Sequence, residues 1–132
     1  MKGPVVVLSS VGRAEDALRL AEALVSQRLA ACVSVVPGLR SVYRWKGEVR
    51  TDDEVLLVVK TRGERLPALK KSLVGMHPYD LPEAIALEVA DGHAPYLEWI
   101  GQETGAARPR LRRPPAPAPR RPRGPRRPRS PR

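Results

Sequence analysis

The amino-acid sequence predicts an α+β fold in which an antiparallel sheet carries helices on one face. Two observations support this prediction. Short β-branched runs alternate with segments of helical periodicity, and two of the predicted strands are joined by a tight turn. The composition changes only after residue 105, so the first 105 residues form one predicted domain.

The first two predicted elements are a strand and a helix. Residues 4–9 (PVVVLS) are β-branched and end in small polar residues, as in a buried strand. Between residues 12 and 30, apolar residues recur every three or four positions. Glu15 and Asp16 occupy the first turn of this helix and Arg28 lies near its other end, so both ends complement the helix dipole.

A long hairpin is predicted for residues 31–61. Pro37-Gly38 interrupts its first arm, which we interpret as a bulge, and Lys46-Gly47 supplies the turn. Residues 55–59 (VLLVV) form a continuous apolar run in the return arm. We therefore expect this run to be buried on both faces.

The last three predicted elements are a helix over 64–75, a strand over 84–90 and a helix over 94–103. Tyr96, Leu97 and Ile100 of the final helix are predicted to point inward. The order β-α-β-β-α-β-α is the split arrangement of ferredoxin-like folds. One sheet face then has no covering helices, so the sequence predicts oligomerisation.

Residues 106–132 differ in composition from the rest of the chain. They hold 11 of the 24 Lys and Arg residues, nine prolines and no acidic residue, which leaves 13 basic against 14 acidic residues in 1–105. The net charge of +10 therefore comes from this segment, which we predict to be a disordered Arg/Pro-rich tail. Three interpretations of the tail remain: a nucleic-acid-binding segment, a solvated segment without a partner, or an incidental extension of the chain.

The composition also excludes several classes of site. Cys32 is the one cysteine, which excludes an intrachain disulfide and a Cys-x-x-Cys motif. No apolar run reaches 18 residues and no secretory signal is recognisable, so a cytoplasmic protein without a membrane partner is expected. No glycine-rich phosphate loop or nucleophile motif is present, so we do not expect an enzyme.

Four stretches in chain order carry a family resemblance: RLAACVSVVPGLRSVYRWKGEV, DEVLLVVKT, HPYDLPEAIAL and YLEWI. Over about residues 3–103 the chain resembles CutA, the divalent-cation tolerance family. The resemblance implies a ferredoxin-like subunit, a compact homotrimer with long hairpins paired across subunits, and a cytoplasmic role in tolerance of copper and other divalent metals. Ser34 stands where many members carry Asn, and the tail is not a usual family feature.

Four residues are candidate metal ligands. Cys32 offers a soft thiolate and His77 an imidazole, donors that suit copper, with Asp80 or Glu83 assisting through carboxylate oxygens. Each main candidate has a structural alternative. Cys32 can be a small buried apolar residue, and His77 a loop histidine hydrogen-bonded to backbone beside Tyr79.

A second hypothesis places a small anionic effector, or a protein, in a cleft between subunits. PII signalling trimers, which share the predicted fold, bind effectors in this way, so the comparison is an analogy of fold. The residues concerned are Lys60, Tyr79 and Trp45. Lys60 can alternatively pair with Glu83 across the sheet.

The remaining charged residues have structural interpretations. Asp52, Asp53 and Glu54 are consecutive, and strand alternation places neighbours on opposite faces. We therefore interpret them as edge charges, with an ion pair to Arg44 or Arg50. His93 precedes the final helix and is predicted to be exposed.

Overall fold

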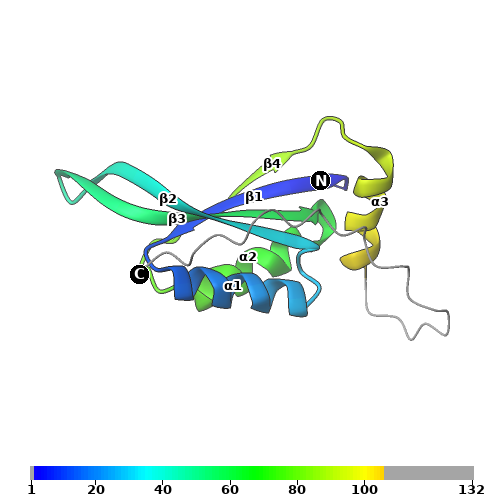
Figure 1. The fold of residues 1–132 in the computed structure, drawn as a ribbon, viewed down its shortest axis with the longest axis horizontal. Coiled ribbons are helices and arrows are strands. Elements are labelled where there is room, and N and C mark those ends of the chain that lie inside the picture. The colour runs from blue at the N-terminus through cyan, green and yellow to red at the C-terminus, as the bar shows by residue number, and fades with distance from the viewer. Residues whose placement is uncertain (1, 106–132) are drawn as a thin grey trace, which may run out of the picture.

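The computed structural model describes residues 2–105 and confirms the predicted order of elements (Figure 1). The strands are β1 (Pro4–Val11), β2 (Cys32–Trp45), β3 (Glu48–Arg62) and β4 (Ile85–Glu88). The helices are α1 (Ala14–Ser26), α2 (Leu66–Met76) and α3 (Ala94–Glu103), and a 3₁₀ turn, η1 (Gly63–Arg65), precedes α2. The predicted tail, 106–132, lies outside the described residues.

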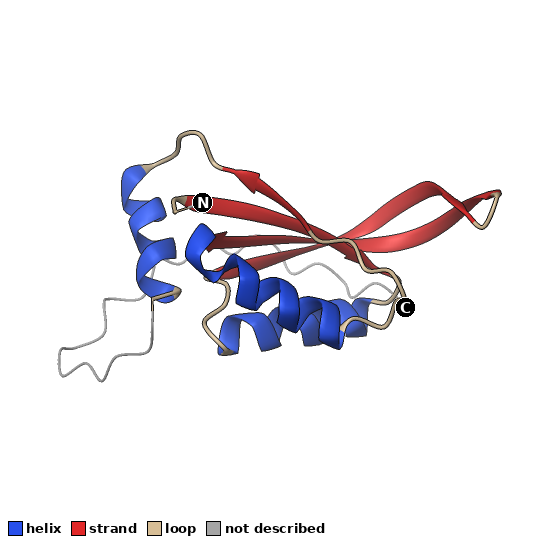
Figure 2. Ribbon diagram, turned by 180° about the vertical axis from the view of Figure 1, so that it is seen from behind, coloured by secondary structure: helices blue, strands red, loops and turns tan. Residues whose placement is uncertain are grey.

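The four strands form one antiparallel sheet in the order β2-β3-β1-β4, which is the ferredoxin-like topology. Helices α1 and α2 lie side by side against one face, and α3 stands at the end of the sheet where β1 begins (Figures 1 and 2). The predicted arrangement of helices on one face is therefore confirmed. None of the helices in residues 2–105 is long and apolar enough to cross a membrane.

The two faces of the sheet differ in burial. Val5, Val7, Leu57 and Val59 point toward the helices and are fully buried, because α1 and α2 cover them. The second face, called the open face below, carries Val6, Leu8, Cys32, Ser34, Val36, Leu56, Val58, Lys60, Ile85 and Leu87. The prediction that residues 55–59 are buried on both faces is wrong within residues 2–105, because no helix or strand of this part of the chain covers the open face. Leu56 and Val58 therefore stay partly exposed.

Helix α1 ends at Ser26, earlier than the periodicity predicts, because Arg28 has a left-handed backbone with φ 59°. The N–H of Arg28 bonds to the carbonyl of Val25, and the N–H of Leu29 bonds to that of Leu24. This pair of bonds is a Schellman motif, in which the left-handed position usually holds glycine. An arginine there carries a conformational cost of about 1 kcal/mol.

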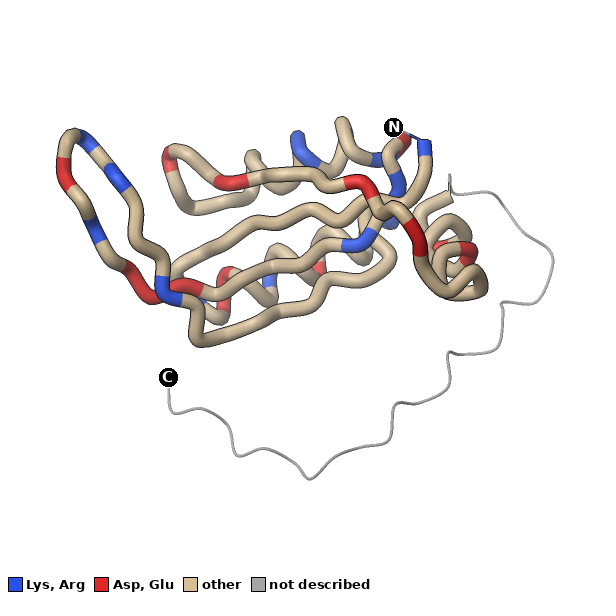
Figure 3. The backbone as a smooth tube through the Cα atoms, turned by 90° about the horizontal axis from the view of Figure 1, so that it is seen from above, with Lys and Arg blue, Asp and Glu red and all other residues tan. Residues whose placement is uncertain are grey.

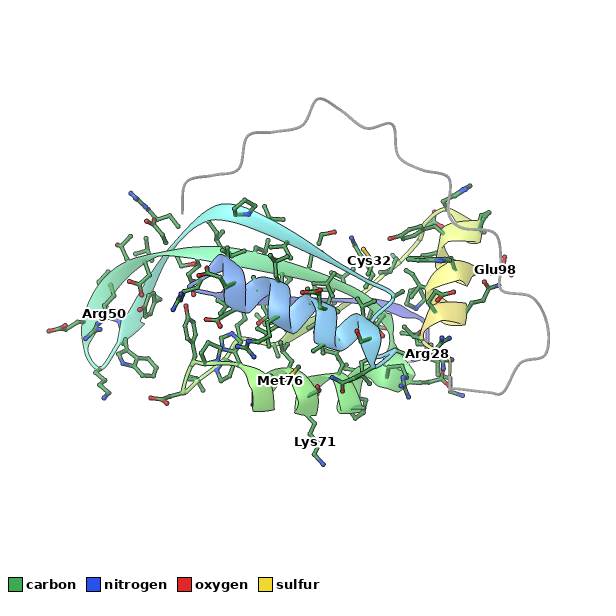
Figure 4. The ribbon with its side chains drawn as sticks, turned by 60° about the horizontal axis from the view of Figure 1, so that its bottom comes forward. Arg28, Cys32, Arg50, Lys71, Met76 and Glu98 are labelled. Atoms are coloured by element: carbon green, nitrogen blue, oxygen red, sulfur yellow. The ribbon has the colours of Figure 1, made fainter. Side chains whose placement is uncertain are left out.

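The side chain of Arg28 explains why an arginine occupies this position. Its Nη2 donates a 2.9 Å hydrogen bond to the carbonyl of Gln102 at the end of α3, and Nη2 of Arg62 donates to the carbonyl of Thr104 at 3.0 Å. Arg28 lies beside α3 in Figure 4. The predicted interaction with a helix C-terminus therefore exists, but with α3 and not with α1.

The packing of α3 differs in one residue from the prediction. Ile100 is buried and Leu97 half-buried, whereas Tyr96 is exposed to 38%. The ring of Tyr96 is tilted against that of Trp99, with centroids 5.5 Å apart. Tyr96 lies in the first turn of α3, a helix that packs mainly against the ends of β1 and β3. Its predicted inward orientation is wrong, because more than a third of its surface is exposed.

The hairpin of β2 and β3 extends beyond the helices (Figure 1). A register shift between Val36 and Leu39, with Gly38 at φ 84°, confirms the predicted bulge. Lys46 and Gly47, at φ 49° and 80°, form the two-residue turn with both residues left-handed, as in a type I′ turn. Acidic and basic residues lie along both arms (Figure 3).

Candidate functional site

His77 follows the last residue of α2 and is buried at the end of β1. Its Nε2 lies 2.8 Å from the carbonyl oxygen of Ser10, which can only accept, so Nε2 carries the proton. Its Nδ1 accepts a hydrogen bond from the N–H of Tyr79 at 3.1 Å. Both ring nitrogens are therefore engaged with backbone in the neutral Nε2–H tautomer, which is the structural alternative proposed from the sequence.

The ring of Tyr79 packs edge-on against His77, with centroids 4.7 Å apart, and directs its hydroxyl to Glu54. The hydroxyl donates a 2.6 Å hydrogen bond to Oε2 of Glu54, a residue that is only 8% exposed. Burial of the phenol, together with this bond to a carboxylate, raises the pKa of Tyr79 above its ordinary value. The loop after α2 is thereby joined to the base of the hairpin.

The predicted ion pair of the acidic run, residues 52–54, with Arg44 or Arg50 is wrong. Arg50 pairs instead with Glu48 at 3.7 Å, and Arg44 forms no ion pair within residues 2–105. Local alternation placed Glu54 at an exposed edge, but the loop after α2 covers it and supplies the partner.

Other residues of the acidic run have partners on the opposite arm of the hairpin. Asp53 pairs with Arg40 at 3.2 Å. The hydroxyl of Tyr43 donates to Asp52, and this bond raises the pKa of Tyr43. The run is thus divided between cross-strand contacts and the buried bond of Glu54. His93 is exposed, as predicted.

Cys32 and Lys60 are directly opposite each other on the open face, in neighbouring strands β2 and β3. Nζ of Lys60 donates to Oγ of Ser34 at 2.8 Å and lies 3.8 Å from Sγ of Cys32. The predicted pairing of Lys60 with Glu83 is wrong, because Lys60 is directed along the open face toward β2, on the side of the sheet away from β4. The thiol of Cys32 is free and half-buried.

A single chain does not gather the four predicted metal ligands. Cys32 lies in the sheet row that contains Val6, whereas His77 bonds to Ser10, four residues further along β1. Four residues of a strand span about 13 Å, which is too far for ligands of one ion. Within residues 2–105, no three His, Cys, Asp or Glu side chains form a group that could hold a metal.

Asp80 and Glu83 are the two predicted ligands that are open to solvent. Both lie in the loop between α2 and β4, and neither forms a hydrogen bond or ion pair within the part of the chain that the structure describes. Their carboxylates are therefore available to a cation, whereas His77 is occupied by backbone.

The three residues of the effector hypothesis are also separate in one chain. Trp45 is opposite Glu48 beside the hairpin turn, and Lys60 lies twelve residues further along β3, roughly 40 Å along an extended strand. Figure 4 shows the two ends of the hairpin, with Cys32 near α3 and Arg50 near the tip. Tyr79 lies between them and bonds to Glu54.

An apolar groove runs between α1 and β2. Its volume is about 360 Å³, and it is lined by Leu18, Ala21, Glu22, Val25, Ser26, Val33 and Val35. Leu18 and Val25 are exposed to 54% and 41% along it. Because β2 is an edge strand, the groove is adjacent to backbone groups that pair with no other strand of residues 2–105.

A family model described as "CutA1 divalent ion tolerance protein" matches residues 5–103. The chain belongs to the CutA1 family. It is 51% identical over 100 residues to "Divalent-cation tolerance protein CutA" of Thermus thermophilus, and covers 97% of that protein and 76% of its own length. It is 47% identical over 100 residues to "Protein CutA 1, chloroplastic" of rice, again over 76% of its own length, but spans only 56% of that relative.

Solved CutA1 structures share the fold. The divalent cation tolerance protein of Thermus thermophilus superposes with a TM-score of 0.76 at 50% identity, over 77% of this chain and 99% of that one. The described CutA1 domain is therefore matched over almost its whole length. The resemblance read from the four sequence stretches is confirmed.

Proposed function

We propose that this CutA1 family member binds divalent cations, copper first, and contributes to metal tolerance without catalysing a reaction. The observation that carries the proposal is the family match over residues 5–103, which supports a role with divalent cations. In addition, the loop after α2 carries the exposed carboxylates of Asp80 and Glu83, which have no hydrogen-bond or ion-pair partner within residues 2–105. We expect copper to be the preferred cation, because thiolate and imidazole donors favour it over harder divalent ions.

One chain does not fit a complete metal site, so we propose that two copies supply it. The loop that holds His77, Asp80 and Glu83 would come from one copy and Cys32 from another. For Nδ1 of His77 to bind a cation, it must release the N–H of Tyr79. The exposed carboxylates of Asp80 and Glu83 therefore bind the cation before His77 does, and His77 becomes a ligand only after the loop rearranges.

The proposed assembly is a homotrimer. The open face has a mainly apolar surface, on which Val36, Ile85 and Leu87 are exposed to 44%, 51% and 50%. Strands β2 and β4 are the two edges of the sheet formed by residues 2–105, and the groove beside β2 is apolar. Pairing an edge of one copy with an edge of another would satisfy backbone groups and extend the apolar rows.

The assembly is tested by light scattering coupled to size-exclusion chromatography on the full chain. We expect the mass of three copies, and a shift toward monomer in Leu87→Lys, which places a charge on the exposed apolar face. Lys71→Glu, on the exposed surface of α2, is the matched control and should stay trimeric. A monomeric wild-type protein at micromolar concentration would contradict the homotrimer.

The metal proposal is tested by isothermal calorimetry of the full chain with copper and zinc salts. We expect copper to bind more tightly than zinc, and Asp80→Asn with Glu83→Gln to weaken binding. Asp53→Asn, which removes an exposed carboxylate already paired with Arg40, is the control and should leave affinity unchanged. Unchanged affinity in His77→Ala with Cys32→Ser would overturn the assignment of those two ligands; absence of binding in the wild type would overturn the proposal.

We also propose a cytoplasmic location. The support is compositional, since no apolar run of the sequence is long enough to span a membrane. Cell fractionation with antibodies against the protein tests it, and recovery in an extracytoplasmic fraction would contradict it.

A further inference from the structure

The pair formed by Cys32 and Lys60 has a chemistry that cation binding does not use. The two residues are direct partners in neighbouring antiparallel strands, so their Cα atoms are held about 5 Å apart by the sheet. Nζ of Lys60 lies 3.8 Å from Sγ, and its bond to Ser34 holds it there. The sheet therefore fixes an amine beside a thiol.

Two further observations restrict what this thiol can do when it is oxidised. Cys32 is the one cysteine of the chain, so no second thiol of the same chain can form a disulfide with it. Lys60 forms no ion pair within the described residues, so its amine is not committed to a carboxylate. Lys60 thus places an amine nucleophile 3.8 Å from Sγ of Cys32.

We propose that hydrogen peroxide converts this pair into a reversible sulfenamide, a covalent bond between Sγ of Cys32 and Nζ of Lys60. The inference goes beyond the proposed cation binding and does not rest on it. A sulfenic acid that meets a thiol or an amide nitrogen condenses in the same way, and an amine is a stronger nucleophile than an amide nitrogen.

The chemistry balances in two steps. The thiol reacts with one hydrogen peroxide, which is reduced to water while sulfur is oxidised by two electrons to the sulfenic acid. The free-amine form of Lys60 then attacks Sγ; the S–N bond forms, the S–O bond breaks, and the departing hydroxide combines with the proton lost from nitrogen. The net change is loss of two hydrogen atoms from the protein and release of two waters.

The geometry suits the half-buried thiol of Cys32. Hydrogen peroxide is nearly as small as water, so it reaches a half-buried thiol more readily than the larger thiol glutathione does. The amine of Lys60 is already part of the sheet, so it does not have to reach Cys32 from solvent. Because the bond joins two adjacent strands, its formation also requires no change of register.

The test treats the full wild-type chain with hydrogen peroxide and follows it by peptide mass spectrometry. We expect a cross-linked peptide that contains residues 32 and 60, about 2 Da lighter than the sum of its parts. Trypsin should no longer cleave after Lys60, iodoacetamide should no longer label Cys32, and dithiothreitol should restore both.

Lys60→Arg is the matched variant, because it keeps the positive charge but lacks the nucleophilic amine. We expect it to oxidise further to the sulfinic acid, about 32 Da heavier, with roughly tenfold less thiol recovered by dithiothreitol. Lys60→Gln provides a second variant if the first folds poorly. Equal recovery in wild type and both variants, or a wild-type product that is only the sulfinic acid or an intermolecular disulfide, would overturn the proposal.

Discussion

The hydroxyl of Tyr79 donates a 2.6 Å hydrogen bond to Glu54, which is buried at the base of the hairpin. The two residues are 25 positions apart, one in the loop after α2 and the other in β3. This bond joins the loop that carries Asp80 and Glu83 to the strand from which the hairpin extends. The orientation of the candidate cation loop therefore depends on it.

Tyr79→Phe should destabilise the protein by about 1–3 kcal/mol, because it leaves a buried carboxylate without its donor. Urea unfolding followed by circular dichroism measures the loss. Tyr43→Phe is the control: its partner Asp52 is exposed, so we expect a loss of less than about 1 kcal/mol. Equal losses in the two variants would show that burial of Glu54 does not determine the strength of the bond.

The same contact predicts a pH dependence at alkaline pH. The pKa of Tyr79 is raised in the folded state above its ordinary value of 10.0, so the folded state holds the phenolic proton more tightly than the unfolded state does. This contribution is fully present below about pH 10 and is lost as the pH rises toward the raised folded value. Between about pH 9 and pH 11, the urea midpoint of the wild type should fall more than that of Tyr79→Phe. Parallel curves would contradict this expectation.

His77 should be found as the neutral Nε2–H tautomer, because the Ser10 carbonyl can only accept and the Tyr79 N–H can only donate. The nitrogen shifts of the imidazole ring in NMR spectra distinguish the two tautomers. A protonated Nδ1 at neutral pH would contradict the hydrogen-bond assignment.

Replacing His77 by Phe keeps a ring but leaves both backbone groups unpaired, so we expect a loss of about 2–4 kcal/mol in urea unfolding. His93→Phe, at an exposed position, should change stability by less than about 0.5 kcal/mol. A loss below about 1 kcal/mol for His77→Phe, or equal effects of the two substitutions, would show that the backbone contacts of His77 contribute little.

Arg28 combines an unfavourable backbone with favourable bonds to α3. Arg28→Ala removes the bonds and keeps the strain, whereas Arg28→Gly removes both. We therefore expect the glycine variant to be more stable than the alanine variant by about 1 kcal/mol in thermal or urea unfolding. At the adjacent Gln27, with φ −81°, the order should reverse and alanine should be the more stable.

The turn of the hairpin offers a stabilising substitution. Lys46 has φ 49° in a type I′ turn, where Asn followed by Gly is favoured. Lys46→Asn should raise the free energy of unfolding by about 0.5–1 kcal/mol, and Gly47→Ala should lower it by a similar or larger amount. Urea unfolding measures both, and a destabilising Lys46→Asn would contradict the turn type.

Local patterns were sufficient for the elements but not for the partners of buried polar groups. Alternation and turn residues located the bulge at Pro37-Gly38 and the turn at Lys46-Gly47, because both depend on neighbouring residues. Nothing within a few residues of Glu54 indicates Tyr79 as its donor. The signal available was a carboxylate immediately before a buried apolar run, a position that requires a partner.

For the candidate site, too, the sequence predicted the residues but not their contacts. The sequence identified Cys32, His77, Asp80 and Glu83 by side-chain chemistry, and the family by four motifs that match over residues 5–103. It contained no information on distance, so it grouped a thiol and an imidazole that the sheet separates by about 13 Å. It also paired Lys60 with Glu83, although strand register places Lys60 beside Cys32.

The sequence by itself determined the order of elements, the topology class and the family, because hydrophobic periodicity and turn chemistry act over a few residues and the motifs are contiguous. Only the tertiary structure decided which side chains meet. Strand register placed Lys60 next to Cys32, and the loop after α2 brought Tyr79 to Glu54 and occupied both nitrogens of His77. These contacts join residues far apart in the chain, and their energies depend on burial and distance that exist only after the sheet and helices have packed.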